Sequence, residues 1–121
     1  ITIVKDAVPN DDQAFSFTNF VTGPFELTDN GSDSESITFT DLVSATYTFT
    51  EVVPVGWDLT NIICTDASGT PDVDGKSVSI ALTPGTDVIC TFENTKQGSI
   101  TVVKNTDGGN GDFQFTRFLK K

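Results

Sequence analysis

Three polar residues occupy positions in apolar segments where side-chain alternation predicts an inward orientation. Lys5 is in phase with the two isoleucines of ITIVKD, Glu51 with the tyrosine and phenylalanine of ATYTFTEVV, and Asn94 with the cysteine and phenylalanine of VICTFENT. Because successive side chains of a strand point to opposite faces, all three residues face the predicted core. Burial of any one of them alone is costly in free energy, so we expect the three to contact one another.

A lysine, a glutamate and an asparagine that meet in an apolar pocket can form an isopeptide bond. Burial lowers the pKa of a lysine and makes a neutral amine available as a nucleophile. A protonated carboxyl group in the same pocket polarises the carboxamide and shuttles protons as ammonia leaves. We therefore expect Glu51 to promote a bond between Lys5 and Asn94, with no metal and no cofactor. The alternatives are a buried Lys5–Glu51 ion pair with a hydrogen-bonded Asn94, or an edge strand that its lysine protects from aggregation.

Segments with alternating apolar residues, bounded by Gly, Pro, Asn and Asp, divide the chain into short strands. The sequence is rich in Thr, Val, Ile and Phe, and no segment repeats its apolar residues at helical spacing. This pattern is typical of an all-β Greek-key sandwich of immunoglobulin-like size. We predict seven antiparallel strands, at residues 1–6, 13–21, 35–41, 45–53, 57–65, 76–82 and 86–94.

The chain then repeats its own beginning. Residues 99–105 and 112–119 match the first two predicted strands, because ITVVK corresponds to ITIVK and FQFT to FSFT. We therefore predict one complete domain at residues 1–98 and the first two strands of a second copy at residues 99–121. Alternatively, residues 99–121 are a donor-strand tail that inserts into the sheet of a neighbouring subunit. In either arrangement Lys104 takes the place of Lys5, and we expect it to serve a crosslink within the next repeat or between subunits.

The two cysteines, Cys64 and Cys90, are both in phase with apolar neighbours. A pair of cysteines in an acidic β-domain that we expect to be exported favours a disulfide. This bond would close a loop of about 27 residues and contribute about 3–4 kcal/mol in the chain-entropy model. The alternative is two buried, inert thiols. Either arrangement gives the cysteines a structural role.

The composition excludes several classes of function. Seven basic and seventeen acidic residues give a formal net charge of −10 at pH 7, whereas nucleic acid and anionic lipid attract basic surfaces. The sequence has no His, which excludes Ser–His and Cys–His catalysis. No apolar run has the length of a membrane-spanning helix. We therefore expect an extracellular chain without nucleic acid, membrane insertion or enzymatic turnover. Its first residue, Ile1, indicates a processed protein or a fragment.

Three segments together resemble a known family. ITIVKD, ATYTFTEVVPVGW and CTFENTK are similar to segments of the B-type repeats of Gram-positive collagen adhesins and of the SpaA-like domains of sortase-assembled pilins. Those domains carry a Lys in the first strand, a Glu before a Pro-x-Gly-aromatic turn, and an Asn followed by Thr in the last strand. Lys5, Glu51 and Asn94 match these positions. The resemblance covers residues 1–96 and restarts at residue 99.

What the resemblance implies is a prealbumin-like sandwich with an intramolecular isopeptide bond, used as a rigid spacer or pilus module. The sequence departs from the family pattern in its two cysteines and in the absence of an LPxTG-like sorting signal. We therefore expect a structural module of an extracellular filament, pilus, surface stalk or adhesin, joined head to tail with copies of itself or with adjacent repeats. The alternative is a ligand-binding adhesin module that recognises a host matrix protein or a glycan.

Overall fold

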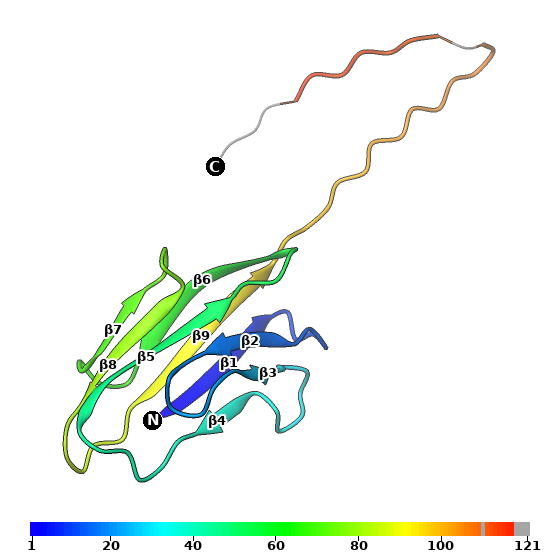
Figure 1. The fold of residues 1–121 in the computed structure, drawn as a ribbon. Coiled ribbons are helices and arrows are strands. Elements are labelled where there is room, and N and C mark those ends of the chain that lie inside the picture. Colours follow the sequence, from blue (N-terminus) through cyan, green and yellow to red (C-terminus); the bar gives the residue numbers. More distant parts are fainter. Residues whose placement is uncertain (110, 118–121) are drawn as a thin grey trace.

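The computed structural model describes residues 1–109 and 111–117, in which two sheets stack face to face (Figure 1). The four-stranded sheet, sheet A, has the order β4-β1-β9-β6, and the five-stranded sheet, sheet B, has the order β3-β2-β5-β8-β7. The strands are β1 (Thr2–Val8), β2 (Phe15–Thr18), β3 (Phe25–Leu27), β4 (Ser36–Thr38), β5 (Ala45–Val52), β6 (Trp57–Cys64), β7 (Gly69–Asp72), β8 (Ser77–Leu82) and β9 (Ile89–Lys96).

The first and last strands lie side by side at the centre of sheet A. β1 pairs with β9 in parallel, with Thr2 opposite Ile89 and Val8 opposite Thr95. The remaining strand pairs of both sheets are antiparallel. The two termini of the sandwich therefore lie at opposite ends, and Figure 1 shows the chain leaving β9 at the end remote from Ile1.

The core forms where the alternating apolar residues of the two sheets face each other. In β1, β8 and β9 every second residue is buried, as expected for strands with one face on the core and one in solvent. Aromatic rings fill the space between the sheets: Phe17 contacts Phe92 edge to face, and Phe15 contacts Trp57 in the same way, each pair with ring centroids 5.1 Å apart. Such pairs add stability beyond the apolar area that they bury.

The all-β sandwich is confirmed, but the predicted number of strands was wrong, and so was their all-antiparallel arrangement, because β1 and β9 are parallel neighbours. The seven predicted ranges each overlap an observed strand, although β1 and β9 extend two residues beyond theirs, and β3 and β7 were missed. β7 has the sequence GTPD, whose Gly and Pro look like turn residues. It lies at the edge of sheet B, where a proline need not donate to a neighbouring strand. β3 has only three residues and follows Pro24 directly, so it carries too little alternation to detect.

The second copy that the repeat predicts does not appear as strands. Among residues 97–109 and 111–117 the structure has no strand, and Figure 1 shows the chain leading away from the sandwich after β9. The apolar residues that match the core of the first copy are exposed here: Ile100 is 93% exposed, whereas Ile1 is 7% exposed. A strand needs partners, and β1 obtains its own from β4 and β9. The predicted strand at 112–119 lies partly outside the described residues.

The predicted disulfide is confirmed. Cys64 of β6 and Cys90 of β9 are opposite each other in the register, and their sulfur atoms are bonded. The loop that the bond closes contains β7 and β8, which belong to the other sheet. Gly69, the first residue of β7, packs directly on this disulfide. A Cβ atom at Gly69 would lie 2.6 Å from Sγ of Cys64 and 3.3 Å from Sγ of Cys90.

We predict that Gly69→Ala destabilises the domain by about 1–3 kcal/mol, because the added methyl group overlaps Cys64 and forces β7 away from the disulfide. Gly98→Ala is the matched control, since a Cβ atom there has no neighbour within 4 Å. Urea unfolding followed by Trp57 fluorescence measures both. Equal unfolding midpoints for the two variants would contradict the prediction.

Candidate functional site

Lys5, Glu51 and Asn94 meet between the two sheets. Lys5 comes from β1 and Asn94 from β9, both in sheet A, and Glu51 comes from β5 in sheet B. They are the buried polar or charged residues of the described part of the chain, at 1%, 2% and 0% exposure respectively. The alternation of each strand turns the side chains inward. Because Lys5 is opposite Phe92 and Asn94 is opposite Ala7, the lysine and the asparagine are offset by two residues on one face of sheet A.

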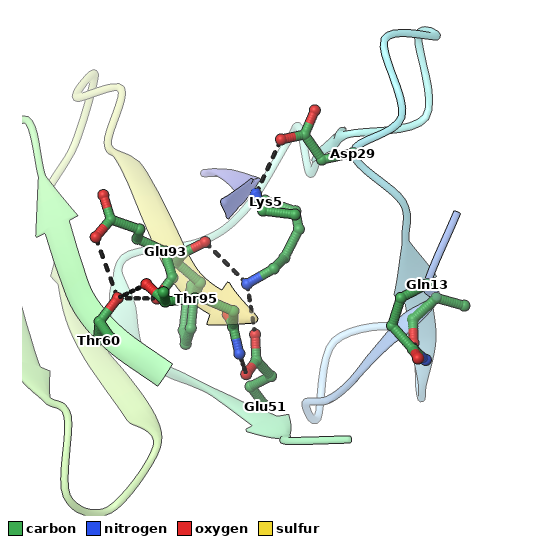
Figure 2. Close-up of polar contacts among 11 residues, drawn as sticks. Lys5, Gln13, Asp29, Glu51, Thr60, Glu93 and Thr95 are labelled. Atoms are coloured by element: carbon green, nitrogen blue, oxygen red, sulfur yellow. Dashed lines mark hydrogen bonds and ion pairs between the residues drawn. The ribbon is translucent and has the colours of Figure 1, made fainter. Parts of the chain in front are cut away.

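The Glu51 carboxylate bridges the other two side chains. Its Oε1 atom accepts a hydrogen bond from Nζ of Lys5 at 3.0 Å, and its Oε2 atom accepts one from Nδ2 of Asn94 at 2.7 Å. Figure 2 shows the Lys5 side chain bending toward the Glu51 carboxylate. One carboxyl group thus holds the amine and the carboxamide at the same time, and it contacts both groups that an isopeptide reaction would join.

The Lys5 amine lies in an apolar enclosure with few acceptors. Nζ also donates to the backbone carbonyl of Phe92 at 3.0 Å and lies 4.2 Å from the centre of the Phe15 ring. Burial lowers the pKa of Lys5 below its ordinary value of 10.5, and the negative charge and hydrogen bond of Glu51 oppose this shift only in part. Deprotonation of this amine to its nucleophilic form is therefore easier than for a lysine in water.

The carboxamide of Asn94 is only half satisfied. Its Nδ2 atom donates to Glu51, but its buried Oδ1 atom has no hydrogen-bond partner among the residues that the structure describes. A buried acceptor without a donor costs free energy. The unpaired atom is the carbonyl oxygen that must be polarised before a nucleophile can attack the carboxamide carbon.

Lys104, which the sequence also singled out, lies elsewhere. Lys104 lies in the exposed segment after the sandwich, with Nζ 4.4 Å from the centre of the Phe113 ring, and the structure does not place it beside a glutamate and an asparagine. Trp57, the aromatic residue of the PVGW turn, is buried and packs on Phe15, so its ring is not exposed for stacking on a glycan, one of the alternative ligands.

Sequence reasoning missed two contributors to the site. The backbone carbonyl of Phe92 in β9 accepts a hydrogen bond from Nζ of Lys5 in β1. This bond could be foreseen only from the parallel register of β1 and β9, which places the two residues opposite each other. The Phe15 ring beside the amine could not be assigned to it without the sheet order.

No helix of the described residues is long and apolar enough to span a membrane.

The lowered pKa of Lys5 predicts a pH dependence in a variant that cannot form the crosslink, Asn94→Ser. Between the lowered pKa and about 10.5 the unfolded chain carries a proton on Lys5 that the folded chain lacks, so stability rises with pH in this window. Urea midpoints measured from pH 7 to pH 10 test this. The double variant Lys5→Met/Asn94→Ser should lose this contribution, and the same slope in both proteins would contradict the assignment.

Comparison with known protein families matches residues 1–96 to SpaA_4, a prealbumin-like fold domain. No curated protein and no solved structure matches the chain. Domains of this family are typical of bacterial surface proteins and pili and are generally non-catalytic. Together with the Cys64–Cys90 disulfide, the match indicates an extracytoplasmic surface protein. From the match over residues 1–96, the chain belongs to the SpaA_4 family of prealbumin-like fold domains.

Proposed function

We propose that this domain is a load-bearing structural module of a bacterial surface filament, pilus or stalk, braced by an isopeptide bond between Lys5 and Asn94. The observation that carries the proposal is the buried Glu51 carboxylate, which hydrogen-bonds both the lysine amine and the asparagine carboxamide. An enclosed carboxylate that only neutralised Lys5 would not require the carboxamide as a second partner.

The reaction requires one proton transfer before the bond forms. Moving a proton from the Lys5 ammonium to Glu51 replaces two buried charges by two neutral groups, which an apolar enclosure favours. A half-turn of the Asn94 carboxamide then turns its unpaired Oδ1 atom toward the protonated carboxyl group, which donates to it and polarises the carbonyl.

The amine of Lys5 then attacks the Asn94 carboxamide carbon. A bond forms between Nζ and that carbon, and the bond from the carbon to Nδ2 breaks. Glu51 accepts a proton from Nζ and delivers one to the leaving nitrogen, so that ammonia leaves and Glu51 ends in its protonated form. The domain acts once on itself and does not turn over a substrate.

The position of the crosslink fits a load-bearing role. Tension applied at the two ends of the domain pulls β1 and β9 in opposite directions along their shared hydrogen-bond ladder. A bond from Lys5 to Asn94 would carry this tension from the first strand to the last and bypass the residues between them. Such a domain resists extension through a covalent bond and not through the rate at which its sheets unfold.

The internal repeat supports an arrangement of several domains in a line. Residues 100–104 repeat the first strand shortly after the end of β9, and Lys104 corresponds to Lys5. We propose that these residues begin the next module of a tandem array, in which Lys104 serves the crosslink of that module. The partners of the domain are then adjacent repeats or copies of itself.

Intact mass tests the crosslink. We predict that the folded protein is lighter than its sequence by one ammonia molecule, in addition to the two hydrogens lost at the disulfide. Lys5→Met, Glu51→Gln and Asn94→Ser should each restore the missing ammonia, because each removes one participant. Compared with Asn94→Ser, the crosslinked chain should gain about 4–5 kcal/mol from closure of its loop.

The control for the mass measurement is Lys96→Ala. Lys96 lies on β9 close to Asn94 but pairs with Asp11 at the surface, so its loss should leave the ammonia deficit unchanged. A folded wild-type protein with the full mass, apart from the disulfide, would refute the crosslink.

Force spectroscopy tests the load-bearing role. When the chain is pulled between residues 1 and 97, we predict that the wild type shows no unfolding step, whereas Asn94→Ser unfolds and releases roughly 30 nm of chain after reduction of the disulfide. If the two proteins unfold with the same step, Lys5 and Asn94 do not form the load path.

A further inference from the structure

We infer that the Pro54–Trp57 turn of one module docks into a hollow at the opposite end of the following module, so that the two form a fixed joint. The inference rests on the tandem arrangement proposed above but not on the isopeptide bond. We name the end of the sandwich that carries this turn and Gln97 the C pole. The end that carries Ile1 and the loops 39–42 and 83–88 is the N pole.

The chain is held firmly up to the residue where it leaves the C pole. The backbone N–H of Gln97 donates to the carbonyl of Gly56 at 2.8 Å, and its side chain donates to Asp58 at 3.0 Å. Immediately before it, Lys96 forms an ion pair with Asp11 at 2.9 Å. The last fixed residue therefore sits directly against the Pro54–Trp57 turn.

The first residue of the module, Ile1, is also held in place by the fold. The amino group of Ile1 donates to the carbonyl of Phe39 at 3.1 Å, as an internal backbone N–H would, and the Ile1 carbonyl accepts from the N–H of Phe39 at 2.8 Å. The Ile1 side chain is buried. A module that begins at Ile100, the counterpart of Ile1, is therefore ordered from its first residue and adds no flexible residues to the link.

Only Gly98 and Ser99 remain as a free link between modules. Three peptide units separate Gln97 from Ile100, and they span at most about 11 Å. Gln97 touches the turn at the C pole, and Ile1 lines the hollow at the N pole. The link therefore forces the turn of one module to lie beside the hollow of the next.

The hollow offers apolar side chains that the turn can contact. The hollow has a volume of about 560 Å³ and is open to solvent, with Leu42, Leu82 and Pro84 among its lining residues. At the apex of the turn, Val55 is fully exposed and the neighbouring Gly56 has a φ of 90°, which fixes a tight bend behind it. An exposed valine on this turn gains free energy when it packs against the apolar side chains among those that line the hollow.

The lining of the hollow also provides a way to break the joint. Asp41 and Asp87 lie in it, and no lysine or arginine side chain is among its lining residues. A carboxylate at position 55 would meet these two carboxylates and repel them. Because Val55 is fully exposed within its own module, the substitution should not disturb that module.

The test uses a duplicated chain in which residues 1–99 precede the complete chain of 121 residues. We expect the amide resonances of loops 39–42 and 83–88 in the second copy to shift relative to the single chain, and small-angle scattering to fit one fixed arrangement of the two modules. A flexible Gly/Ser insertion after Ser99 of the first copy should abolish the shifts and broaden the range of arrangements.

Val55→Asp in the first copy should have the same effect as the insertion. The same substitution in the second copy is the matched control and should leave the joint intact. If the duplicated chain gives the resonances of the single chain, or if Val55→Asp has equal effects in both copies, the docking is refuted. The mass of the same samples reports the isopeptide bonds separately, so a flexible joint between crosslinked modules would overturn this inference and leave the proposed function standing.

Discussion

The parallel pairing of β1 with β9 is the constraint on which the rest of the structure depends. It joins residues more than eighty positions apart in the sequence and places the beginning and end of the domain at the centre of one sheet. Every other feature of interest follows from this pair. Lys5 and Asn94 share a face because their strands are neighbours, the disulfide ties β9 to its other neighbour, and the two termini point in opposite directions because the strands run the same way.

Burial of the polar site costs free energy of desolvation, and the sandwich offsets this cost with hydrogen-bond partners. A lysine, a glutamate and an asparagine are taken out of water together, and each has at least one hydrogen-bond partner from the others or from the backbone of Phe92. The unpaired carbonyl oxygen of Asn94 is the remaining cost. Neighbouring strands of sheet A supply the amine and the carboxamide, and the facing sheet supplies the carboxyl group, so packing of the sheets assembles the site.

The sequence predicted the burial and contact of three polar side chains better than it predicted the edges of the sheets. Lys5, Glu51 and Asn94 occupy core-facing positions in strands that are otherwise apolar on that face. A buried polar side chain needs a hydrogen-bond partner, and the other two polar side chains provide one. β3 and β7 carry no comparable signal, because short edge strands with Gly or Pro are read as turns. The repeat that begins at residue 99 can be recognised in the sequence. A strand forms only where a neighbouring strand pairs with it, and residues 100–106 have no such neighbour among the described residues. The close approach of Gly69 to the disulfide depends on tertiary packing and leaves no trace in the sequence.

The disulfide loop also has a consequence for the response of the domain to proteolysis. The β7–β8 hairpin lies wholly between Cys64 and Cys90, and it forms the outer edge of sheet B. A single cut anywhere in this hairpin or its flanking turns leaves both fragments attached to sheet A through the bond between β6 and β9. Cleavage at the edge of the sandwich therefore does not divide the chain, and a nicked domain still links whatever precedes it to whatever follows.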